Sequence, residues 1–236
     1  MRVPADYLID VPAGAGGIPP DLIMRAFAAT WRVDLDTPGF AVLDFGPVAS
    51  RALRAAMLGL KDGLDAELAR RGGGRFAYRS LGRFDQQATT RLHRDGAPDR
   101  SLLMLGYEAS AVRSRLVMAD LARCARDQAL TPRQLLDDFN PMYRKGEELL
   151  APYVTELAPP ADGHARIVLV NNSALPFEPG ADHPLGVLHG AEIPAPDPSR
   201  PRVINSIMLM VGEPDAVGPA TLREFVAIDA ISGPLG

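Results

Sequence analysis

The chain has 236 residues, of which 47% are hydrophobic and 23% charged, so a large buried core can form and extensive disorder is excluded. A net charge of −4 disfavours a non-specific nucleic-acid-binding protein, which normally carries a basic excess. The single cysteine, Cys124, excludes a disulfide framework within one chain and predicts a buried structural thiol.

The N-terminal sequence MRVPADYLID lacks the charged start and apolar stretch of a signal peptide. No run reaches the 18 or more apolar residues that are needed to span a bilayer. We therefore expect a cytoplasmic protein that contacts neither membrane nor nucleic acid.

Helices dominate the first third of the chain. The Pro- and Gly-rich residues 1–18 predict a loop, and 19–33 predicts an amphipathic helix with Pro near its start. A short apolar strand is expected at 39–46, followed by a long amphipathic helix over 48–71 that a run of three glycines ends. Residues 1–74 are thus expected to be a helical support within one domain.

The remainder predicts a β core over 75–211 with a helical insert at 113–151. One or two strands are expected in 75–92. The other expected strands are 101–109, 164–174, 186–194 and 202–211, and the insert is expected to hold helices at 113–129 and 132–151. Short strands separated by Pro- and Gly-rich loops favour a barrel or double sheet over parallel βαβ units. The sequence therefore predicts an α+β domain with a jelly-roll-like core and helices packed outside.

The segment RLHRDGAPDR (91–100) contains a His-Arg-Asp sequence that also opens the catalytic loop of protein kinases. A kinase loop requires Asn five residues after the Asp, but that position is Arg100. No Asp-Phe-Gly follows, and no Gly-rich loop of the required spacing precedes it. These differences exclude the kinase interpretation.

His93 and Asp95 instead suit a metal site. Residues i and i+2 of an extended segment point to the same side, so both can bind one ion while Arg94 turns away. A non-haem Fe(II) site needs two imidazoles and one carboxylate. Among the other histidines, His189 lies in an apolar strand and needs a partner for its imidazole, whereas His164 and His183 lie in loop-like segments.

Arg202 and Ser206 lie 13 and 17 residues after His189, at the start of an apolar strand. Four residues apart on a strand, they face the same side, and a guanidinium beside a hydroxyl is a good receptor for a carboxylate. Arg200 is an alternative carboxylate ligand.

Together, His93-x-Asp95, His189, and Arg202 with Ser206 resemble the 2-oxoglutarate- and Fe(II)-dependent dioxygenases. The resemblance covers roughly 75–211 and implies a double-stranded β-helix in which His93, Asp95 and His189 bind Fe(II). It also implies that Arg202, with Ser206, binds 2-oxoglutarate, whose oxidative decarboxylation by O₂ is coupled to oxidation of a small organic substrate. Because halogenating members lack the carboxylate, Asp95 favours hydroxylation or desaturation.

Two alternatives stay open: a cupin-like metal enzyme that does not use 2-oxoglutarate, and a non-catalytic β-barrel that binds a ligand without metal. Taken singly, His93 and Asp95 are also typical of a surface turn, and His189 of a core histidine. Gln87, Thr89 and Arg91 are expected to share the face of His93, with either exposed or substrate-contacting roles. Asn172 is expected at the end of a strand, in a turn or a functional role. The substrate and the oligomeric state have no signature in the sequence.

Overall fold

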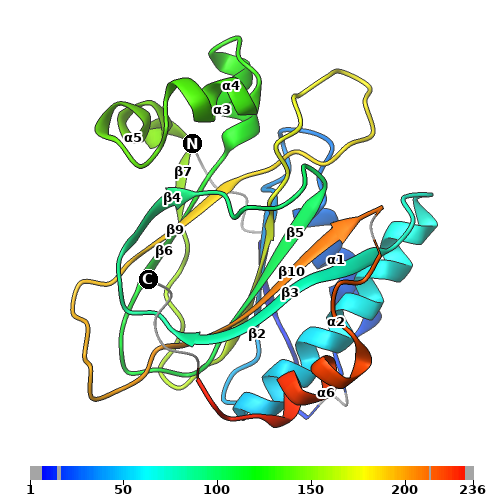
Figure 1. Ribbon diagram of the computed structural model, residues 1–236, viewed down its shortest axis with the longest axis vertical. Helices are drawn as coiled ribbons and strands as arrows, with labels where there is room; N and C mark the ends of the chain where they lie inside the picture. Colours follow the sequence, from blue (N-terminus) through cyan, green and yellow to red (C-terminus); the bar gives the residue numbers. More distant parts are fainter. Residues whose placement is uncertain (1–6, 15–16, 213, 232–236) are drawn as a thin grey trace.

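The protein is described by a computed structural model for residues 7–14, 17–212 and 214–231. Its described residues form two β-sheets with helices outside them, a mixed α+β architecture (Figure 1). The six-stranded sheet has the order β1-β2-β8-β5-β10-β3, and the four-stranded sheet has the order β4-β9-β6-β7. All neighbouring strands are antiparallel except β1 and β2, which are parallel.

The strands of the six-stranded sheet are β1 (Leu8–Asp10), β2 (Phe40–Asp44), β8 (Arg166–Asn171), β5 (Ser101–Tyr107), β10 (Val203–Val211) and β3 (Phe76–Asp85). Those of the four-stranded sheet are β4 (Thr90–His93), β9 (Leu188–Glu192), β6 (Arg115–Ala119) and β7 (Val154–Glu156). From β3 to β10 the chain passes repeatedly between the two sheets, so segments distant in sequence become neighbours.

Helices α1 (Pro20–Thr30), α2 (Ser50–Arg70) and α6 (Pro219–Ala227) lie along the six-stranded sheet (Figure 1). One apolar cluster joins α1 and α2 to this sheet and includes Leu102 and Met104 of β5. Leu103 and Leu105 of the same strand belong to a second cluster that also contains Met118 of the four-stranded sheet. The alternation of side chains along a strand thus explains why β5 is apolar on both faces.

The predicted helix over 113–129 is wrong in its first half. Residues 115–119 form β6, which pairs with both β9 and β7, and only then does α3 (Leu121–Asp127) begin. Asp120 separates the two elements because its side chain accepts a hydrogen bond from the backbone N–H of Arg123, as an N-cap does. A short apolar segment such as 115–119 is compatible with a strand or a helix, and here hydrogen bonding to a neighbour on each edge favours the strand.

The predicted helix over 132–151 is divided into α4 (Pro132–Asp138) and α5 (Arg144–Leu150), followed by the 3₁₀ turn Ala151–Tyr153. Pro141 lies in the break, where it would remove a helical hydrogen bond. Strands β1 and β7 and helix α6 were not predicted. Of the predicted loop 1–18, residues 1–6 and 15–16 lie outside the described residues, and β1 lies within the rest.

Cys124 is fully buried in α3, as predicted. Across the described ranges of the chain, the search for a helix with the length and hydropathy of a membrane span finds none.

Candidate metal centre

His93 and His189 face each other across two strands. Strand β4 pairs antiparallel with β9, and the register places His93 opposite His189, with ring centroids 4.2 Å apart. Asp95 follows two residues after the end of β4, and its Oδ1 lies 3.4 Å from Nε2 of His93. One ligand atom from each of the three side chains lies within 4.8 Å of the others, so a single ion can contact all three.

The backbone orients the His93 imidazole. Nδ1 of His93 lies 2.8 Å from the carbonyl oxygen of Arg91, which can only accept a hydrogen bond. Nδ1 therefore carries a proton and donates, and Nε2 remains on the side of Asp95. Metal-binding histidines are commonly fixed in this way by a hydrogen bond from their second nitrogen.

The three side chains influence one another's pKa. The hydrogen bond to Asp95 raises the pKa of His93, although burial opposes this. Burial and the neighbouring His93 lower the pKa of His189 to about 4. Burial alone would raise the pKa of Asp95, but its hydrogen bond to His93 and the attraction of both imidazoles keep it below its usual value. A neutral imidazole at His189 and an ionised carboxylate at Asp95 are the forms that bind a metal ion.

The buried polar atoms test whether these residues fit a metal. Nδ1 of His189 is buried and has no hydrogen-bond partner among the described residues. A buried polar atom without a partner is costly and is rare in folded proteins. Two imidazoles and one carboxylate converge here, and one of the imidazoles has a buried nitrogen without a partner among the described residues. Such a set suits a non-haem Fe(II) ion or a similar divalent metal.

One pocket connects the three side chains with Arg202 and Ser206. Its wall includes Arg202, Ile204 and Ser206, which alternate at the start of β10 as their spacing predicts. The other lining residues are Phe84, Gln86, Thr90, Leu105, Tyr107, Leu116, Met118, Gly190 and Ala191. Met118 pairs with His189, and Ser114, four residues earlier in the chain, contacts Arg202. The pocket therefore extends from the three candidate ligands toward Arg202.

Arg202 is a buried cation without a carboxylate partner. It is 3% exposed, and it donates from Nη1 to the carbonyl of Gln86 (2.7 Å) and from Nη2 to Oγ of Ser114 (3.0 Å). Its guanidinium carbon lies 5.2 Å from the centroid of the Tyr107 ring. No Asp or Glu in the described part of the chain forms a salt bridge with it. A buried guanidinium that contacts only neutral acceptors is suited to bind an anionic ligand.

The alternative cation, Arg200, does not reach the pocket. Its side chain is 65% exposed, and its nearest charged partner is Asp197 at 3.6 Å. Gln87 holds the surrounding loop, since its Nε2 donates to the carbonyls of Asp197 and Arg200 and its Oε1 accepts from the N–H of Asp197.

The expectation that Gln87, Thr89 and Arg91 share the face of His93 is wrong. Thr89 accepts a hydrogen bond from the N–H of Ile193, and Arg91 forms an exposed ion pair with Glu147. The register between β4 and β9 shifts between Thr90 and His93, and such an irregularity breaks the period of two. The inward residues are therefore Gln86 and Thr90, which the alternating pattern could not identify.

The remaining histidines have other partners. Nδ1 of His164 lies 2.7 Å from Oδ1 of Asp44. Nε2 of His183 donates to the carbonyl of Pro176 (2.6 Å). Each of these imidazoles has a protein partner, whereas His189 faces His93.

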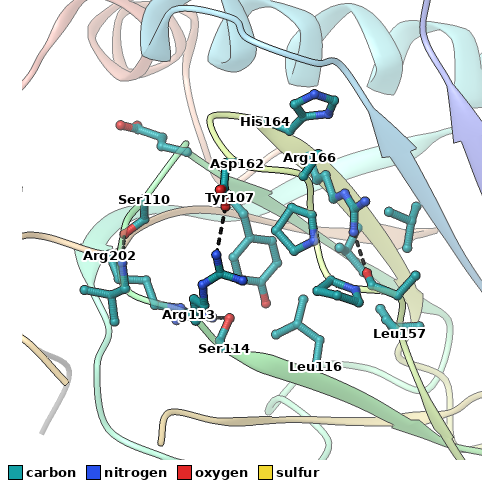
Figure 2. A pocket seen from close by; sticks show the side chains of 18 residues that line it. Tyr107, Ser110, Arg113, Ser114, Leu116, Leu157, Asp162, His164, Arg166 and Arg202 are labelled. Atoms are coloured by element: carbon teal, nitrogen blue, oxygen red, sulfur yellow. Dashed lines mark hydrogen bonds and ion pairs between the residues drawn. The ribbon is translucent and has the colours of Figure 1, made fainter. Parts of the chain in front are cut away.

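A second pocket lies on the other side of Arg202. Figure 2 shows the Tyr107 ring in its middle, between the Arg202 and Ser114 side and Arg166. Tyr107, Leu116 and Arg202 line both pockets. Arg113 and Asp162 form an exposed ion pair at this pocket, with Nη2 3.1 Å from Oδ1.

No protein-family model and no curated protein sequence matches this chain. Two solved structures of the iron and alpha-ketoglutarate-dependent endoperoxidase NvfI resemble it. One, of a single-residue variant, has 13% identity and a TM-score of 0.38, covering 76% of this chain and 80% of that one. The other, described as a different conformation, has 14% identity and a TM-score of 0.35, covering 78% and 82%.

Proposed function

We propose that this protein is a non-haem Fe(II)- and 2-oxoglutarate-dependent oxygenase. The observation that carries the proposal is one pocket that holds both the His93–Asp95–His189 cluster and the buried guanidinium of Arg202, which has no carboxylate partner in the described chain. The first group suits Fe(II), and the second suits the far carboxylate of a keto acid.

The order of the strands supports a double-stranded β-helix built from β3 to β10. In this proposal β3, β10, β5 and β8 form one face of the barrel, and β4, β9, β6 and β7 form the other. The chain is then a single oxygenase domain over 1–236. Its N-terminal part (1–74) supports the barrel through α1 and α2, and 75–211 supplies the core.

His93, Asp95 and His189 would hold the metal and leave one side of it open toward the pocket. Bound Fe(II) would supply the redox chemistry with O₂ that couples decarboxylation of 2-oxoglutarate, giving succinate and CO₂, to hydroxylation of a small organic substrate. The carboxylate of Asp95 favours hydroxylation or desaturation over halogenation.

The other residues of the pocket would orient the keto acid. Arg202 would pair with its distal carboxylate through the N–H groups that Gln86 and Ser114 leave free, and Ser206 would add one donor. Leu105, Met118 and Ile204 would pack against the carbon chain and exclude water from it.

Anaerobic titration with Fe(II) and then 2-oxoglutarate tests the proposal. The expected result is a weak visible charge-transfer band that requires both additions, followed by succinate release when O₂ is admitted. Protein that binds Fe(II) but gives neither band nor succinate would instead be a cupin-like metal enzyme. Protein that binds no metal would be a ligand-binding barrel.

A further inference from the structure

Asn172 is a fully buried residue that holds the backbone of Asp95 on both sides. The Asp95 N–H donates to Oδ1 of Asn172 (3.1 Å), and Nδ2 of Asn172 donates to the Asp95 carbonyl (3.1 Å). Nδ2 also donates to Oγ of Ser101, the first residue of β5. One side-chain amide therefore pairs with the peptide groups before and after a candidate metal ligand, 77 residues away in sequence.

Arg94 holds the same loop from inside. Its Nε donates to the backbone carbonyl of Asn172 (2.6 Å), and its Nη2 donates to the carbonyls of Ala97 (2.6 Å) and Pro98 (2.8 Å). Arg94 turns away from the cluster, as expected, and its side chain binds three backbone carbonyls that hold the loop in place. The loop 94–100 is thereby fixed against the end of β8.

The three candidate ligands differ in how the fold holds them. His93 and His189 lie on paired strands, where the register fixes both. Asp95 lies outside the strands, and the ladder does not constrain its backbone. A loop carboxylate that is free to move would lose conformational entropy on binding an ion, and the affinity would fall accordingly.

We propose that Asn172 is a positioning residue that presents Asp95 to the metal, with Arg94 anchoring Asn172 in turn. The inference rests on the proposed metal site. It deepens that site by assigning the orientation of the third ligand to the residue that directly follows β8 of the six-stranded sheet. Partners of this kind, which orient a ligand without touching the metal, typically change metal affinity by about 10- to 100-fold when removed.

The test is a Co(II) titration of the full chain, with cobalt as an optical probe for the metal site. Asn172→Ala should bind Co(II) about 10- to 100-fold more weakly than wild type. The matched control is Asn171→Ala. Asn171 is equally buried and adjacent, but its amide donates to the carbonyl of Thr30 and does not contact Asp95. This control should lose about as much thermal stability as Asn172→Ala, while its Co(II) affinity should stay within about twofold of wild type.

A double-mutant cycle separates positioning from a general loss of structure. If Asn172 acts through Asp95, Asn172→Ala should leave the residual Co(II) affinity unchanged when it is combined with Asp95→Ala. An equal loss of affinity in both backgrounds would overturn the inference.

Arg94→Ala is a second variant for the case that Asn172→Ala does not fold, because it leaves the Asn172 amide in place. We expect it to weaken Co(II) binding by about tenfold. Wild-type affinity in both Arg94→Ala and Asn172→Ala would overturn the inference while leaving the metal site intact. Wild-type protein that binds no Co(II), or binds it equally well after His189→Ala, would overturn the proposed metal site itself.

Discussion

Replacing Arg202 by Gln isolates the anion-binding half of the pocket. Gln keeps a polar side chain of moderate size but removes the charge and the two-pronged donor geometry. Removing one partner of a buried, hydrogen-bonded charge pair costs about 3–5 kcal/mol. Since every 1.4 kcal/mol is a factor of ten in affinity, 2-oxoglutarate should bind roughly 10²- to 4 × 10³-fold more weakly.

The substitution also removes the hydrogen bonds to Gln86 and Ser114, each worth about 0.5–1.5 kcal/mol of stability. The variant should therefore unfold at lower urea concentration while still binding metal, because Arg202 is not among the clustered ligands.

The assay is anaerobic calorimetric titration of 2-oxoglutarate into Co(II)-loaded protein, after a separate Co(II) titration. Arg200→Gln is the matched control, since it removes the same side chain from an exposed position two residues away, and its affinity should stay within about twofold. Unchanged 2-oxoglutarate affinity in Arg202→Gln, or loss of metal binding in that variant, would refute the division of roles.

Further predictions concern the candidate metal ligands, the stability in acid and two glycines with different surroundings. Alanine at any one of the three clustered ligands should abolish tight Co(II) binding, whereas His164→Ala, which changes an imidazole paired with a carboxylate elsewhere, should keep it. Burial would raise the pKa of Glu108, but hydrogen bonds from Ser50, Asn205 and Arg83 outweigh it and lower the pKa below its usual 4.5. The corresponding stability is present above pH 4.5 and is lost as the pH falls below it, so urea midpoints of Glu108→Gln should decline less on acidification than those of wild type; parallel curves would contradict this. Gly186→Ala should destabilise the fold by about 1–3 kcal/mol, since its Cβ would meet the carbonyl oxygen of Ser173. Gly59→Ala, with open space around an exposed position of α2, should instead stabilise it by about 0.5–1 kcal/mol, and equal urea midpoints for the two variants would contradict both expectations.

The spacing of apolar residues predicted those helices and strands in which one apolar period continues without interruption. The two long helices and strands β2, β5, β8, β9 and β10 lie close to their predicted ranges, because each has a clear apolar pattern. The pattern was insufficient at β6, a strand of five residues directly before a capped helix. Pairing with two neighbours determines that strand, and a single sequence does not contain this information.

The candidate site was predictable where its residues are close in sequence as well as in space. Arg202 and Ser206 are four residues apart, so the alternation of an extended chain places both at the pocket. His93 and Asp95 are only two residues apart, so their side chains lie close together although Asp95 follows the end of β4. His189 is distant in sequence, and it was chosen as the third ligand only because an imidazole in an apolar strand needs a polar partner.

The sequence could not reveal contacts that depend on a register shift or on long-range packing. Thr90 enters the pocket because the register of β4 shifts, and the Asn172 amide meets Asp95 only when the sheets come together. The environment of Glu108 also depends on long-range packing. Glu108 is enclosed by groups from β3, β10 and α2, including Arg83 and Arg54, which lie 25 and 54 residues away in the chain.

The pairing of His93 with His189 would make a metal bound at this site a link between distant parts of the chain. In the unfolded chain Asp95 and His189 are 94 residues apart, and bringing such distant groups together carries an entropic cost that grows with loop length. An ion that binds only the folded state stabilises it by mass action. At a free-ion concentration of a hundred times the dissociation constant, this adds about 2.7 kcal/mol to the free energy of unfolding. This ion would fasten β4, an edge strand of the four-stranded sheet, to β9, so depletion of the metal should open that sheet first at this edge.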